Sequence, residues 1–176
     1  MSLLHFLGLG HPAGADASRE ETASVRRIVE ALDRMEPEAA RRLARFAFVL
    51  GRVARADLTV SAEETVAMER MVMLRGGLTE AQAVVAVQIA KSQNALFGGT
   101  DDYLVTRELA ASTTRDEKLA LLDCCFAVSA ADHDITGEEE AELRKIANEI
   151  GLSHADLIAA RTAYRDSLAV LKRPGA

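Results

Sequence analysis

The sequence is poor in the residues that characterise β-rich domains. It has no tryptophan, three prolines and only 4% aromatic residues in a chain of 176. Its apolar content is mostly alanine, leucine, valine and isoleucine, and no window of strand length alternates apolar with polar residues. Such a composition is typical of helices, and we expect an all-α protein without a sheet.

Long hydrophobic runs are also lacking. A membrane helix needs roughly 18 to 20 apolar residues, whereas the longest stretch here, residues 83–90, is interrupted by Gln88. The apolar start is broken by His5 and Gly8, and no basic residue precedes Arg19, which is unlike a secretory signal. We therefore expect no integral membrane span and an apolar N-terminal appendage over residues 1–17. Three alternatives are open for this appendage: packing on the body of the protein, dimerisation, or peripheral membrane contact.

Cysteine is scarce and its placement is informative. The only two cysteines, Cys124 and Cys125, are adjacent, and on a helix their side chains point about 100° apart, which disfavours a bond between them. They lie in an apolar stretch and are expected to be buried packing residues. The sequence therefore predicts a reducing, cytoplasmic compartment.

The sequence has few of the motifs that mark catalytic or nucleotide sites. It contains no His-Glu-x-x-His, no Glu-x-x-His and no Walker-type loop, and Gly8-x-Gly10 follows no predicted strand. The net charge is -6, from 21 basic and 27 acidic residues, which repels phosphate backbones over most of the surface. We expect a protein that is not an enzyme, has no organic cofactor and binds no nucleic acid.

Helix-capping signals are abundant. Several Ser or Thr residues are followed three positions later by Glu or Gln, the pattern of a capping box. These pairs are Ser61 and Glu64, Thr79 and Gln82, Thr114 and Glu117, and Thr136 and Glu139. Glycines at 76–77, 98–99 and 151 are predicted to end three helices. The sequence predicts a single-domain bundle of seven or eight helices over residues 18–173.

An internal repeat is visible when the chain is aligned with itself. Residues 56–64 (ADLTVSAEE) match residues 131–139 (ADHDITGEE) at an offset of 75 residues. The similarity extends to flanking apolar and glycine positions, giving repeat units of about 40–97 and 115–171. Two such units suggest a bundle with an internal pseudo-twofold duplication.

The second unit resembles a known family. Leu121-Leu122-Asp123, the run from Ala127 to Asp132, Ile135-Thr136, Glu138 to Glu140 and Gly151-Leu152-Ser153 are similar in order and spacing to the tellurite-resistance protein TerB-like family. The resemblance implies an all-helical fold with a duplication, a surface that binds a divalent cation, and a role in tellurite or stress response. We expect a protein partner to take part in that role.

The two acidic loops are the candidate cation site. The predicted ligands are Asp57, Glu64, Asp132, Asp134 and Glu139. Carboxylate oxygens suit Ca²⁺ or Mg²⁺ better than Zn²⁺. The second loop is expected to be the better ligand set, because Asp134 has Thr59 as its counterpart in the first loop. The alternative is that these acids serve only as helix caps and turn residues.

A stripe of arginines is the second candidate. On a helix predicted over residues 37–56, four arginines share the side opposite the apolar stripe, with one phenylalanine among them. These residues are Arg41, Arg45, Phe48, Arg52 and Arg55. They form either a surface for a protein partner or an ordinary solvated face whose arginines pair with neighbouring glutamates, and a loop or another helix over Phe48 is a further alternative. The alternative function is a structural or scaffolding bundle without metal, which binds its partner through the Arg41 to Arg55 face or through the N-terminal appendage.

Overall fold

The computed structural model describes residues 26–53, 62–92, 99–132 and 134–171 of the chain. Within these residues the regular elements are helices, joined by short turns. A helical segment at 26–33 comes first. The helices that follow are α3 (Pro37–Val53), α4 (Ala62–Gly76), α5 (Glu80–Ser92), α6 (Gly99–Ser112), α7 (Arg115–Asp132), α8 (Gly137–Glu149) and α9 (His154–Ala163), with short 3-10 turns η3 (Arg165–Ser167) and η4 (Ala169–Leu171). The all-α prediction of seven or eight helices is confirmed.

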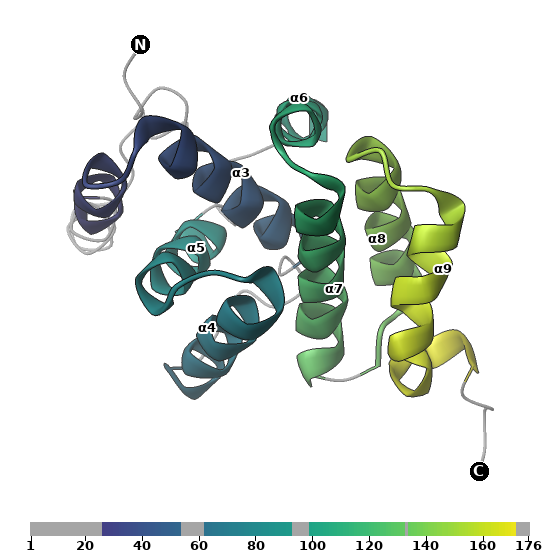
Figure 1. Cartoon of the computed structure of the whole chain (residues 1–176). Helices are drawn as coiled ribbons and strands as arrows, with labels where there is room; N and C mark the ends of the chain where they lie inside the picture. Colours follow the sequence, from purple (N-terminus) through teal and green to yellow (C-terminus); the bar gives the residue numbers. More distant parts are fainter. Residues whose placement is uncertain (1–25, 54–61, 93–98, 133, 172–176) are drawn as a thin grey trace.

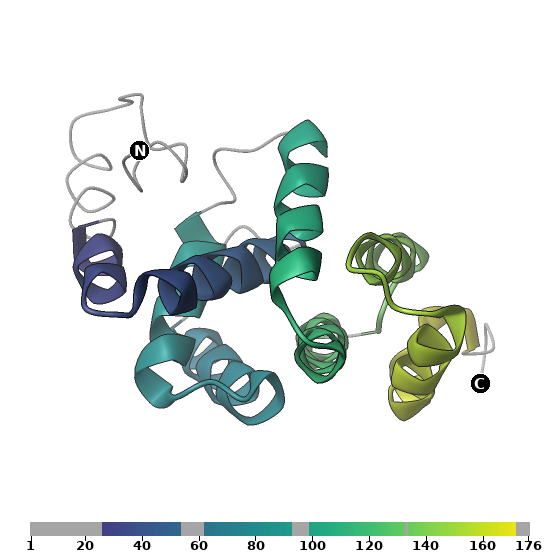
Figure 2. The ribbon, with the colours of Figure 1, turned by 45° about the horizontal axis from the view of Figure 1, so that its top comes forward.

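Helix α7 occupies the centre of the bundle. It packs against α3 and α4 on one side and against α8 and α9 on the other, as Figure 1 shows. Helix α5 lies on α3 and α4, and α6 lies on α3 and α8. The view in Figure 2 looks along α7 and separates the two groups of helices that it joins. None of the described helices is long and apolar enough to cross a membrane.

The hydrophobic core follows the inner face of α7. Leu122 and Phe126, one helical turn apart, are fully buried with Leu50 of α3 and Ile146 of α8. Both cysteines are buried and unbridged, as predicted. Burial raises the pKa of the Cys124 thiol to about 12 and that of the neighbouring Cys125 thiol well above its ordinary value, so both stay protonated at neutral pH.

The predicted capping boxes are present wherever the structure describes them. At the start of α5, Thr79 N donates to Gln82 Oε1 (3.0 Å), and Gln82 N donates to Thr79 Oγ1 (3.3 Å). The same reciprocal bonds begin α7 and α8. A further box, Ser153 with Asp156, begins α9 and was not predicted. Ser61 of the remaining pair lies outside the described residues.

Two of the three predicted glycine stops are confirmed. Gly77 and Gly151 have φ of 65° and 77°, the left-handed conformation in which glycine has no Cβ penalty. The third stop was predicted at Gly98 and Gly99: it is wrong for Gly99, which is the first residue of α6, and Gly98 lies outside the described residues. A first-turn N–H needs no intrahelical partner, so a glycine is tolerated at that position as well as at a stop.

Gly151 provides a clean test of backbone strain. Replacing it with alanine should lower the free energy of unfolding by about 1 to 2 kcal/mol, because φ stays positive although no atom obstructs the new Cβ. Gly137→Ala is the control, since Gly137 also has open space around it but no positive φ. Chemical denaturation of both variants measures the difference. Equal stability of the two would contradict the strain argument.

The internal duplication stays a prediction. The order α3, α4, α5 is followed by the order α7, α8, α9, and the structure packs α4 on α7 and α8 on α3. A pseudo-twofold relation that maps α3 onto α7 and α4 onto α8 requires these two contacts to occur together. The predicted appendage, residues 1–17, lies outside the described residues.

Candidate functional site

The turn between α7 and α8 holds the acidic residues of the second predicted loop. Thr136 caps α8, and Glu139 completes the reciprocal capping box. The Oε2 atom of Glu139 accepts hydrogen bonds from Thr136 N (2.8 Å) and from Thr136 Oγ1 (2.9 Å). Glu139 therefore acts as a capping residue, as the alternative interpretation of the loops proposed. One of its oxygens is occupied by the cap.

Ile135 ties this turn to the C-terminal segment. Its N–H donates to the carbonyl of Ser167 (2.6 Å), and its carbonyl accepts from Ala169 N (3.0 Å), which forms a bridge with Leu168. The side chains of Ile135 and Leu168 are buried. Asp134, directly before this anchor, is half-buried. The backbone of the turn is thus held both by the cap of α8 and by residues 167–169.

The remaining predicted cation ligands are only partly placed. Asp57 lies outside the described residues. Glu64 lies in the first turn of α4 and Asp132 ends α7, but their side chains are also outside the described set. Asp134 and Glu139 are brought to the same end of α8. Within the described part of the chain, no three His, Cys, Asp or Glu residues are grouped so that they could hold a metal ion.

The predicted arginine face of α3 is largely covered. Phe48 is buried, and Arg52 has no exposed side-chain surface, so the prediction that these two residues face a partner is wrong. Helix α3 is covered by α5 on one side and by α6 and α8 on another, so the part of its polar stripe that contains Phe48 and Arg52 lies inside the fold. Arg41 is exposed and pairs with Glu38. Arg55 lies outside the described residues.

Arg45 follows the other interpretation of the stripe, in which its arginines pair with neighbouring acids. Its guanidinium donates to Glu108 Oε2 (3.0 Å) and to Ser112 Oγ (3.3 Å), both on α6. Only 13% of the Arg45 side chain is exposed. Arg45 therefore joins α3 to α6.

Arg52 is the centre of a polar cluster that joins three helices. Its Nε donates to Glu142 Oε1 (2.8 Å), and its Nη1 donates to Glu149 Oε2 (2.6 Å), both on α8. Thr106 of α6 donates to the same Glu149 oxygen (2.7 Å). Burial alone would raise the pKa of Glu149, but the hydrogen bonds from Arg52 and Thr106 outweigh it and lower the pKa. We call Arg52, Thr106, Glu142 and Glu149 the Arg52 cluster.

Asp123, part of the family-like motif, forms a second polar contact between distant elements. Tyr164 donates its hydroxyl to Asp123 Oδ1 (2.8 Å), and Arg75 Nη1 donates to Asp123 Oδ2 (3.0 Å). The ring of Tyr164 stacks on Phe126 with centroids 5.5 Å apart. Burial and the Asp123 carboxylate raise the pKa of Tyr164, so its hydroxyl remains a donor. Asp123 thus holds the chain after α9 against α7 and α4.

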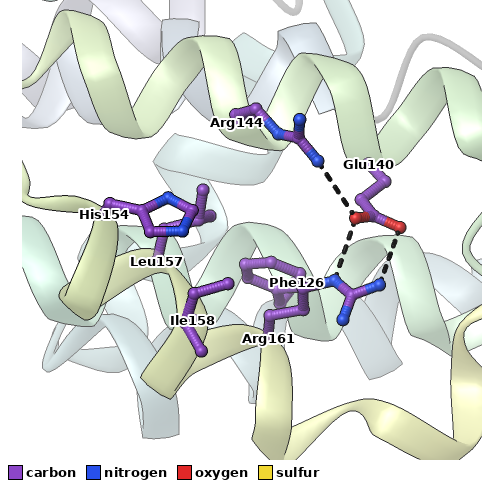
Figure 3. A pocket seen from close by; sticks show the side chains of 7 residues that line it. All are labelled: Phe126, Glu140, Arg144, His154, Leu157, Ile158 and Arg161. Atoms are coloured by element: carbon purple, nitrogen blue, oxygen red, sulfur yellow. Dashed lines mark hydrogen bonds and ion pairs between the residues drawn. The ribbon is translucent and has the colours of Figure 1, made fainter.

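A small cavity of about 130 Å³ opens between α7, α8 and α9. It is lined by Phe126, Glu140, Arg144, His154, Leu157, Ile158 and Arg161 (Figure 3). Arg161 donates two hydrogen bonds to the Glu140 carboxylate, from Nε to Oε1 (2.9 Å) and from Nη2 to Oε2 (3.3 Å). Arg144 approaches the same carboxylate from the other side at 3.4 Å. Two guanidinium groups therefore share one carboxylate at the mouth of the cavity.

A wider, open depression lies beside the cavity. The second space, of about 620 Å³, shares Glu140, Arg144 and Arg161 with the first and adds Lys145 and Val170 among its lining residues. We call the two together the α8–α9 groove. The sequence analysis did not identify it. The spacing of Glu140 and Arg144, four residues apart, was a local signal, but Arg161 reaches them only through the fold.

A comparison with protein families decides the assignment. The model of the family described as "Tellurite resistance protein TerB" matches residues 44–162, more than half of the chain. The chain belongs to the TerB family. Searches of curated proteins and of solved structures gave no match.

The TerB match runs from α3 into α9 and includes the turn between α7 and α8. It ends just before the C-terminal segment that supports this turn. Tyr164 and Leu168 lie beyond the match, yet they contact Asp123 and Ile135 inside it. In this TerB protein the residues after α9 are therefore part of the same folded unit.

Proposed function

We propose that this TerB-family protein is a non-enzymatic helical binding module of tellurite or stress response. In this proposal the turn between α7 and α8 takes up a divalent cation, Ca²⁺ or Mg²⁺ rather than Zn²⁺, and the protein associates with a protein partner. The two buried, unbridged thiols support a reducing, cytoplasmic compartment and offer no nucleophile.

The observation that carries the cation proposal is the fixed, acid-rich turn. Asp134, Glu138, Glu139 and Glu140 lie within seven positions, and Ile135 fixes the backbone of this turn from the C-terminal side. A preformed turn lowers the ordering cost of bringing oxygen ligands around a hard cation. Glu140 is engaged by Arg161, and one oxygen of Glu139 is engaged by the cap. The proposed ligands are Asp134 and Asp132, which the repeated loop pattern identifies, together with the oxygen of Glu139 that does not accept the capping bonds.

Calorimetric titration of metal-stripped protein with Ca²⁺, Mg²⁺ and Zn²⁺ tests this proposal. Asp134→Asn removes a proposed ligand charge and should weaken Ca²⁺ or Mg²⁺ binding about tenfold or more. A hundredfold excess of cation over its dissociation constant should also stabilise the fold by about 2.7 kcal/mol. The melting temperature with and without cation measures this second effect.

Asp116→Asn is the matched control, because Asp116 is an exposed acid in the first turn of α7, a helix that begins with the same type of capping box. It should leave the heats unchanged. The cation proposal would be contradicted by equal binding heats for wild type, Asp134→Asn and Asp116→Asn, or by a melting temperature that the cation does not change. The acids of the turn would then have a capping role alone.

A further inference from the structure

We propose that the α8–α9 groove is the docking surface for an acidic segment of a partner protein, one in which carboxylate and aliphatic side chains are interspersed. The proposal specifies the chemistry of the partner and rests on the protein association proposed above. It does not depend on a bound cation.

Charge complementarity is the first argument. The chain carries a net charge of -6, yet the groove is lined by Arg144, Lys145 and Arg161. Glu140 offsets one of the two arginines that share it. The other carboxylate at the groove, Glu149, shares the buried guanidinium of Arg52 with Glu142. The lining of the groove therefore carries three cations against two carboxylates, an excess of one positive charge on an acidic protein, which attracts acidic groups and disfavours basic ones.

The accessibility of these cations is the second argument. The side chain of Arg144 is 60% exposed, and its 3.4 Å contact with Glu140 is longer than a strong charge-assisted hydrogen bond. The side chain of Lys145 is 53% exposed and lies 4.0 Å from Glu149. Arg161, in contrast, is held firmly by its two bonds to Glu140. A ligand carboxylate can therefore pair with Arg144 and Lys145 without breaking the contact that supports the groove.

The apolar part of the groove identifies the kind of anion. Ile158 and Val170 are large aliphatic side chains left exposed in the lining of the groove, and buried Phe126 and Leu157 line the cavity. A small inorganic anion would satisfy the arginines and leave this apolar surface in water. A peptide with both acidic and aliphatic side chains covers both, with an aliphatic side chain entering the cavity.

Fluorescence polarisation in buffer with EDTA tests the proposal. One labelled peptide alternates glutamate with leucine, and a matched peptide carries glutamine in place of every glutamate. The acidic peptide should bind saturably and about tenfold or more tightly than its neutral counterpart. Added salt should weaken its binding, because the exposed charges of the groove are screened.

Variants on the two sides of the molecule locate the site. Arg144→Glu and Ile158→Asp should each weaken the acidic peptide about tenfold. Val170→Asp, at a side chain that is 67% exposed, repeats the apolar test should Ile158→Asp perturb the fold. The controls are Arg70→Glu and Leu74→Asp on α4, where an exposed arginine and an exposed leucine lie one turn apart, and they should have no effect.

Three results would overturn the docking proposal: equal binding of the two peptides, equal losses from the α4 controls, or full displacement of the peptide by millimolar inorganic phosphate, which would indicate a small-anion site. Because EDTA is present throughout, failure of peptide binding counts against the groove alone. The calorimetric titration decides separately on the cation.

Discussion

Replacing Arg52 with methionine should lower the free energy of unfolding by about 3 to 5 kcal/mol, the usual cost of breaking a buried ion pair from one side. Methionine retains most of the aliphatic bulk of the arginine, so the loss reports mainly on the charge. Glu149, whose side chain is only 9% exposed, would keep its negative charge without the guanidinium that now pairs with it. Urea or guanidinium denaturation at neutral pH measures the effect.

The double variant Arg52→Met with Glu149→Gln is the control, because it removes the orphaned charge and should recover part of the loss. The pH dependence adds an independent check. The lowered pKa of Glu149 stabilises the fold above the ordinary glutamate pKa of 4.5, and this contribution disappears as the pH falls through the lowered value. The Arg52→Met variant should lack that part of the acid dependence. A loss below about 1 kcal/mol, typical of an exposed pair, would contradict the buried-pair argument.

Local sequence signals predicted the local structure of this protein well. The Thr136 and Glu139 pair identified the start of α8, and Gly151 identified its end, because a capping box and a left-handed glycine need only neighbouring residues. The adjacent cysteines were recognised as core residues from the apolar stretch around them. Gly99 was misplaced because glycine is compatible with either end of a helix, and only the following residues decide which.

The environment of each helix face was harder to predict. The periodicity of α3 separated its apolar stripe from the stripe that contains Phe48 and Arg52. The second stripe was expected to be a partner surface or a solvated face, with a covering loop or helix over Phe48 left open. Because α6 and α8 cover that side of α3, Phe48 is buried and Arg52 finds its acids on α8. A helical period shows which residues share a face, but it does not show how many faces the fold covers.

The candidate sites show the same limit. Asp134 and Glu139 were identified from a repeated loop pattern, since their spacing along the chain is short. The α8–α9 groove was not identified, because Glu140 and Arg161 are 21 residues apart and meet only after α9 folds back on α8. Tyr164 and Asp123, 41 residues apart, are a further example. Contacts of this kind depend on tertiary packing and leave no periodic signal in the sequence.

Phe126→Ala should be the most damaging change in the core of the second unit, with a loss of about 3 to 5 kcal/mol in the free energy of unfolding. Phe126 is fully buried on α7, stacks on Tyr164 and separates the small cavity of the α8–α9 groove from the core. Removing its ring joins a new void to that cavity and leaves one face of Tyr164 without a partner. Denaturant unfolding, together with the melting temperature, measures the loss.

Tyr164→Phe is the matched variant, because it keeps both rings and removes only the hydroxyl that donates to Asp123. It should cost about 1 kcal/mol, the net value of one hydrogen bond. The two variants should differ greatly in stability, because Phe126→Ala removes a large buried apolar area whereas Tyr164→Phe removes only one hydrogen bond. A comparable loss in both would mean that the bond from Tyr164 to Asp123, and not the packing of Phe126, fixes the chain after α9 on α7.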